Sequence, residues 1–164
     1  MIANVDLFIA IALSVFAAIA VLADSINLLA GIGFVSDSTL SSLPHPQVVK
    51  SLFLSFSSEV DPLLRLNPPW FYAMMILNLG HVAFYLFAVP RILRKQDVRG
   101  PALFWCGSML TILFVITFEE FMGPAPTRDP LRFTAAYGSY MVVPLVVLKR
   151  FWNDEKHETK LKRK

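Results

Sequence analysis

The chain has 164 residues, of which 55% are hydrophobic and only 16% are charged, whereas about 25% of the residues of a soluble domain carry a charge. A soluble core of this length could not bury so much apolar surface, so the composition indicates an integral membrane protein. The basic residues gather at the ends of apolar stretches, which argues against a nucleic-acid partner, and the single cysteine excludes an intrachain disulfide and argues against a metal cluster.

The first apolar stretch has no formal charge from Leu7 to Ala23, and only Asp6 precedes it. Because the basic start of a secretory signal is missing, we predict a retained span over about 5–29. Asp24 falls within this span, where a carboxylate costs at least about 2.5–3.5 kcal/mol at bilayer depth. Two interpretations stay open: Asp24 is an interfacial charge at the end of a short span, or it faces a cavity as a polar anchor.

Residues 34–69 form the only sizeable predicted segment outside the membrane. Apolar residues recur at helical spacing from Val48 to Phe56, which predicts a short amphipathic helix at the lumenal interface. Asp61-Pro62 predicts the start of another short helix, and Asn67-Pro68-Pro69 predicts its end. Trp70 then marks the entry into a second span over about 70–90.

Polar residues of the second span share one side of the predicted helix. Asn78, His81 and Tyr85 follow one another at spacings of three and four, so this side is expected to face the bundle interior. His81 has two interpretations, a hydrogen-bonded packing residue or a proton donor that contacts a ligand. The choice between them stays open.

The third span is predicted over about 101–121, with a weaker polar stripe of Ser108 and Thr111 that favours hydrogen bonds to its own helix backbone. Thr111 is nevertheless included among the candidate ligand contacts. Glu119 and Glu120 close the span and are interpreted as lumenal interface charges near the mouth of a cavity.

The fourth span is predicted over about 131–149. Tyr137 and Tyr140 share a face, either toward a ligand or as anchors at the membrane interface. Pro144 removes the hydrogen bond to the carbonyl of Tyr140, so we predict a kink that opens space inside the bundle.

Basic residues predict the orientation in the membrane. The Arg91–Arg99 segment and the end of the chain lie on one side of four spans, which the positive-inside rule makes cytosolic. We therefore predict an all-α integral membrane protein in which residues 1–150 form a four-transmembrane-helix bundle enclosing an intramembrane cavity. Residues 151–164 are predicted to form a basic cytosolic tail, and both termini are expected in the cytosol.

Four motifs occur in order along the chain: Asp61-Pro62-Leu63-Leu64, Pro68-Pro69-Trp70-Phe71, Phe118-Glu119-Glu120-Phe121, and Tyr137-Gly138-Ser139-Tyr140 with Pro144. In this order the chain resembles the EXPERA-domain family, and within it the sigma-2 receptor family. The resemblance implies a protein of the endoplasmic reticulum whose four helices surround an occluded cavity for sterols and amphiphilic amines, often as a homodimer. No cofactor is expected.

The resemblance also assigns residues. It implies that Asp24 pairs with an amine or a second acid, and the place of that acid is taken here by Asn78, which can still hydrogen-bond Asp24. It carries the family's acid near the cavity mouth over to Asp61 and its tyrosines to Tyr137 and Tyr140. The terminal Lys160-Leu161-Lys162-Arg163-Lys164 resembles a dilysine retrieval signal.

Three functions are considered, with binding of a sterol, another lipid or an amphiphilic amine as the main hypothesis. The candidate ligand-binding residues are Asp24, Asn78, His81, Thr111, Tyr137 and Tyr140. The candidate residues at the cavity mouth or in a structural role are Asp61, Glu119, Glu120 and Pro144. The second hypothesis is a sterol isomerase like the emopamil-binding branch, whose second span has a Glu four residues after its His, whereas Tyr85 holds that place here. The third is a structural or chaperone-like partner of another membrane protein.

Overall fold

The computed structural model describes residues 4–25, 28, 56–66 and 68–152. These residues form helices joined by turns and short connections, and none of them lies in a strand. Four of the helices are long and apolar enough to cross a membrane: Asn4–Leu22, Pro69–Leu93, Arg99–Met122 and Pro130–Trp152. The predicted class, an all-α membrane protein with four spans, is confirmed.

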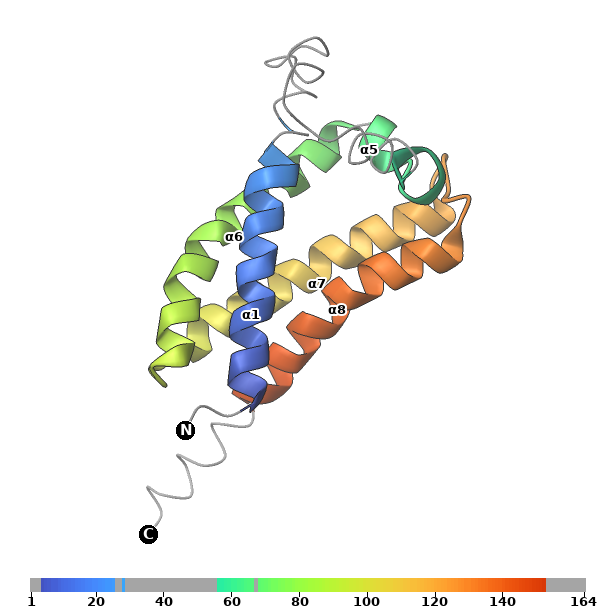
Figure 1. Ribbon diagram of the computed structural model, residues 1–164. Coiled ribbons are helices and arrows are strands. Elements are labelled where there is room, and N and C mark those ends of the chain that lie inside the picture. Colours follow the sequence, from blue (N-terminus) through green and yellow to red (C-terminus); the bar gives the residue numbers. More distant parts are fainter. Residues whose placement is uncertain (1–3, 26–27, 29–55, 67, 153–164) are drawn as a thin grey trace, which may run out of the picture.

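The long helices associate as two pairs (Figure 1). α1 (Asn4–Ile19) packs along α6 (Pro69–Leu93), while α7 (Arg99–Met122) packs along α8 (Pro130–Trp152). The pairs touch each other near the edge where α1 begins and α8 ends, and they diverge toward the opposite edge (Figure 1). There the short helices η2 (Phe56–Val60) and α5 (Leu63–Leu66) lie over the end of α7 and the start of α8.

The inward face of the first pair follows the spacing of an α-helix. On α1 the buried side chains Ile9, Leu13, Phe16 and Ala20 succeed one another at intervals of four, three and four. On α6 the buried positions are Phe71, Met75, His81, Tyr85, Ala88 and Ile92. Asn78 falls on the same stripe, so the side of α6 that the sequence predicts to face inward does so.

The second pair is built in the same way. The buried residues of α7 are Ala102, Trp105, Cys106, Met109, Ile112, Leu113, Ile116 and Glu120. On α8 they are Phe133, Val143, Pro144, Val147 and Phe151. Cys106 is buried, and its thiol donates to the carbonyl oxygen of Pro144 at 3.3 Å, which joins α7 to α8.

Charged contacts close the edge where α1 begins. The guanidinium of Arg150 donates from Nε to Oδ1 of Asp6 at 2.9 Å, and Nε of Arg99 donates to the carbonyl oxygen of Phe151 at 3.2 Å. The start of α1, the start of α7 and the end of α8 therefore share one edge, as four antiparallel spans require.

The helix boundaries agree in part with those predicted from the sequence. The first helix continues past Ile19 as a π-helix, η1 (Ala20–Asp24), which the sequence did not predict. α5 ends at Leu66 and α6 begins at Pro69, so the predicted stop before the second span is confirmed. Apart from Leu28, the predicted first span beyond Ser25 lies outside the described residues. So do nearly all of the predicted 48–56 helix and the 153–164 segment with Lys160 and Lys162.

Candidate functional site

Asp24 lies at the end of η1, one turn beyond the buried Ala20, and therefore continues the inward stripe of α1. The side-chain amide of Asn78 donates a hydrogen bond to Oδ2 of Asp24. The amide thus satisfies one carboxylate oxygen across the α1–α6 contact. π-Helical turns are frequent at functional sites because they change where the following side chains point.

His81 lies one turn after Asn78 and reaches the other helix pair. Its Nε2 atom hydrogen-bonds the Ser108 hydroxyl on α7 at 3.0 Å. Two buried atoms of this region, Oδ1 of Asn78 and Nδ1 of His81, have no hydrogen-bond partner among the residues that the structure describes. An unpaired buried polar atom costs about 1–3 kcal/mol, so these two atoms carry an unmet demand for hydrogen bonds. We call Asp24, Asn78, His81 and Ser108 the inner cluster.

Aromatic rings adjoin the inner cluster where the four helices meet. Phe16 of α1 stacks on Tyr140 of α8, with ring centroids 4.8 Å apart, and its centroid lies 6.4 Å from those of Tyr85 and Trp105. The indole N–H of Trp105 donates to the Tyr85 hydroxyl at 3.2 Å. The cluster therefore combines a carboxylate, amide and imidazole groups, and flat apolar walls.

Thr111 and Pro144 lie apart from this arrangement. Thr111 is exposed on α7 and donates its hydroxyl back to the carbonyl oxygen of Gly107 at 2.8 Å, so the structure does not bring it together with the other candidate ligand residues. α8 continues through Pro144, which is buried against α7. Pro144 thus serves the packing of the second helix pair.

A second polar group, which we call the rim cluster, consists of Asp61, Glu120 and Tyr137. Asp61 and Glu120 are both 0% exposed. The Tyr137 hydroxyl donates to Oδ2 of Asp61, and the backbone N–H of Leu63 donates to Oε1 of Glu120 at 3.2 Å. The carboxyl groups of Asp61 and Glu120 lie within hydrogen-bonding reach of each other. Tyr137, predicted as a ligand contact, instead holds the η2–α5 segment against α8.

Burial changes the acidity of Asp61. Its pKa is raised above the ordinary value of 3.8, mainly because burial removes solvent from the charged form, while the hydrogen bond from Tyr137 opposes the rise. Two neighbouring buried carboxyl groups cannot both ionise at low cost, so the rim cluster favours holding a proton between them.

The interpretation of Glu119 and Glu120 as a pair of interface charges is wrong for Glu120. Glu119 is half-exposed, but Glu120 faces inward because it follows Ile116 by four residues on the buried stripe of α7. The inward direction of Glu120 could not be predicted from the sequence. Two adjacent residues of a helix point about 100° apart, and nothing in the local sequence shows which of them faces the core.

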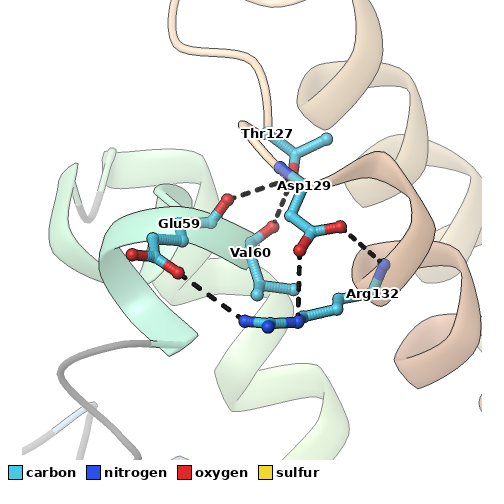
Figure 2. Close-up of polar contacts among 5 residues, drawn as sticks. All are labelled: Glu59, Val60, Thr127, Asp129 and Arg132. Atoms are coloured by element: carbon cyan, nitrogen blue, oxygen red, sulfur yellow. Dashed lines mark hydrogen bonds and ion pairs between the residues drawn. The ribbon is translucent and has the colours of Figure 1, made fainter.

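The connection between α7 and α8 is fastened to η2 (Figure 2). The Thr127 hydroxyl donates to the carbonyl oxygen of Val60 at 2.7 Å, and the Asp129 N–H donates to the carbonyl oxygen of Glu59 at 3.1 Å. Arg132 forms ion pairs with Asp129 at 3.2 Å and with Glu59 at 3.6 Å. These contacts explain why η2 and α5 lie over the ends of the second helix pair.

Sequence reasoning missed three residues at or beside the inner cluster. Ser108 was assigned to its own helix backbone, although its spacing from Trp105 and Ile112 places it beside the buried stripe of α7. Phe16 and Trp105 looked like ordinary apolar residues of a span. Their positions at the intervals of three and four that line the interior were the available signal.

Family comparison bears on the whole chain. Residues 5–162 match the family model described as the transmembrane domain of transmembrane 6 superfamily member 2-like proteins. The chain belongs to this family. No curated protein and no solved structure matches it.

This match overturns the resemblance to the EXPERA-domain and sigma-2 receptor families. The motifs that carried it combine prolines at helix starts, a tryptophan at the membrane interface and polar residues near span ends. Helical membrane proteins in general need such residues at the same places, so their order is less specific than it looks. The isomerase hypothesis rested on the same resemblance and loses its support with it.

Proposed function

We propose that this member of the transmembrane 6 superfamily member 2-like family binds a lipid-like or sterol-like molecule within the membrane, with the polar end of that molecule at the inner cluster. The observation that carries the proposal is the pair of buried, unpartnered atoms on one face of α6, Oδ1 of Asn78 and Nδ1 of His81. Because the two residues are one turn apart, a single small polar group can reach both atoms.

The chemistry of these atoms favours particular headgroups. The amide oxygen of Asn78 accepts hydrogen bonds only, whereas Nδ1 of His81 accepts or donates according to its tautomer. A hydroxyl group, which both donates and accepts, suits the pair, and a protonated amine suits Asn78 together with the Asp24 carboxylate. The rings of Phe16 and Tyr140 supply apolar surface for the adjoining part of the molecule.

We propose as well that the edge bearing Asp6, Arg99 and Arg150 faces the cytosol. Arg91, Arg94, Lys95 and Lys149 add positive charge to this edge, and a surplus of lysine and arginine marks the cytosolic ends of spans. The η2–α5 segment then lies on the lumenal side.

The ligand proposal is tested by binding of two probes to the purified full-length chain, a fluorescent neutral sterol and a cationic amphiphilic amine. Asp24→Asn keeps a side chain that Asn78 can hydrogen-bond but removes the charge. We expect Asp24→Asn to lower the binding affinity for the amine about tenfold or more, since a charge-assisted hydrogen bond contributes about 1.5–3 kcal/mol. The affinity for the neutral sterol should fall much less.

The matched control is Thr111→Val, which removes a hydroxyl from the exposed face of α7 and should change neither probe. His81→Phe removes Nδ1 while keeping a ring, so it should weaken the neutral sterol. Equal losses of both probes in Asp24→Asn, or no loss of either, would contradict the role of Asp24 as polar anchor. If Thr111→Val lost sterol binding and His81→Phe kept it, the inner cluster would not be the ligand site.

A further inference from the structure

A groove runs along the outer flank of the first helix pair, away from the inner cluster. It has a volume of about 350 Å³ and is lined by eight residues, among them Leu7, Ala10, Ser14 and Ala18 of α1 with Val89 and Leu93 of α6. The small side chains Ala10, Ser14 and Ala18 recur every four residues, so they form the floor of the groove on one side of α1. The Ser14 hydroxyl is turned back to the carbonyl oxygen of Ala10 at 2.8 Å, which leaves the floor apolar.

One end of the groove opens at the basic edge of the bundle. Leu7 belongs to the first turn of α1 and Leu93 is the last residue of α6. The chain then turns back tightly, because Lys95 adopts a φ of 56° and the N–H of Gln96 donates to the carbonyl oxygen of Arg91 at 2.8 Å. This helix cap holds Arg94 and Lys95, both exposed, directly after the groove residue Leu93.

Positive charge dominates this edge. Its described basic residues are Arg91, Arg94, Lys95, Arg99, Lys149 and Arg150, against the two acids Asp6 and Asp97. Asp6 is already bound by Arg150 at 2.9 Å. Asp97 accepts a hydrogen bond from the N–H of Arg99 at 2.9 Å. The edge therefore presents a surplus of cations at headgroup depth, next to an apolar channel.

Two occupants fit such a groove, an acyl chain or a helix of a second copy. The positive charge of the neighbouring edge distinguishes between them. A second copy in the same membrane has the same orientation, so a symmetric contact along this flank would bring two basic edges together. An acidic phospholipid matches both parts of the feature, since its chain is apolar and its headgroup is negative. Basic pockets between membrane helices are a recurrent form of such lipid sites.

We propose that the α1–α6 groove binds an acyl chain of an acidic phospholipid whose headgroup is held by Arg94 and Lys95. This site lies on the outer flank of the bundle and is separate from the inner cluster. Phosphatidylserine is the probe of choice, because it differs from phosphatidylcholine in net charge while its acyl chains can be kept identical.

The test is native mass spectrometry of the full-length chain in a nonionic detergent, titrated with dioleoyl phosphatidylserine or dioleoyl phosphatidylcholine. The wild type should bind phosphatidylserine more tightly. Arg94→Gln and Lys95→Gln should each lower the affinity for phosphatidylserine about fivefold, which is the effect of one basic residue near an anionic headgroup. The affinity for phosphatidylcholine should stay unchanged. Arg128→Gln removes one charge at the opposite edge and should affect neither lipid.

Larger side chains that fill the groove test whether it binds an acyl chain. Ala18→Phe should lower the affinity for both lipids, and Ser14→Leu should lower it to a smaller extent. Leu86→Phe is the matched control, since Leu86 is 70% exposed on α6 and does not line the groove. Equal affinity of the wild type for the two lipids would overturn the proposal, as would equal losses in Arg94→Gln and Arg128→Gln. A change from dimer to monomer in Ala18→Phe with unaltered lipid binding would assign the groove to a second copy instead.

Discussion

Asp61 is the residue whose environment departs furthest from what its position in the sequence indicates. It follows η2 in a polar segment outside the spans, yet its side chain is fully buried between Tyr137 and Glu120. The raised pKa of Asp61 means that the folded protein binds a proton more tightly than the unfolded chain does. By linkage, its contribution to stability is fully present at a pH below the unfolded value of 3.8 and is lost as pH rises through the raised folded value.

Replacing Asp61 with asparagine should therefore flatten the dependence of stability on pH. The asparagine oxygen can still accept the hydrogen bond from Tyr137, and the side chain can no longer ionise. Thermal unfolding in detergent across pH 4–9 should show that the midpoint of the wild type falls, relative to that of Asp61→Asn, as pH rises. A difference between the two midpoints that stays constant over this range would show that Asp61 does not titrate in the folded protein. Asp97→Asn, at an exposed position, is the control.

Single elements show how far sequence patterns reach in this chain. The long helices were predictable because the membrane requires about 20 apolar residues per span and because the residues facing inward recur at intervals of three and four. Asn78, His81 and Tyr85 illustrate this, since their spacing alone placed them on the inward side of α6. Proline signals likewise gave the end of α5 and the start of α6.

Other elements could not be predicted, because their structure depends on contacts between distant residues. Contacts of Thr127 with η2 hold the connection before α8 in place, and Thr127 lies nearly 70 residues after Glu59 and Val60. The π-helical turn Ala20–Asp24 has no distinctive composition. Of the candidate ligand residues, Asp24 and Asn78 are hydrogen-bonded to each other, whereas the directions of Thr111 and Tyr137 depended on packing.

Phe16 gives a direct test of how the two helix pairs are joined. It is 8% exposed and contacts rings of all three other long helices, whereas Phe8 of the same helix is 46% exposed. Phe16→Ala should lower the free energy of unfolding by about 3 kcal/mol, near the lower end for buried phenylalanine because lipid already solvates apolar groups in the reference state. Phe8→Ala should change it by less than about 1 kcal/mol. Unfolding by a denaturing detergent measures both, and equal effects would contradict Phe16 as the central contact.

The molecule as a whole has two unlike edges. At one of them, Arg150 and Asp6 join the end of α8 to the start of α1, and basic residues surround the contact. At the other edge, the rim cluster and the η2–α5 segment cover the end of α7 and the start of α8. The inner cluster, the outer groove and the rim cluster thus occupy separate places, so that a substitution in one of them tests that feature without removing the contacts of the others.

Orientation in the membrane is the prediction at this largest scale. The native Cys106 is buried, so a cysteine introduced at an exposed position should react selectively with an impermeant maleimide. With the plasma membrane alone permeabilised, Lys95→Cys should be labelled because it lies at the basic edge, and Arg128→Cys should be protected until the internal membranes are dissolved. The physical reason is that moving the basic residues of this edge across the bilayer is far more costly than leaving them in the cytosol. The reverse pattern of labelling would invert the proposed orientation, and it would place Arg94, Lys95 and their lipid headgroup in the lumenal leaflet.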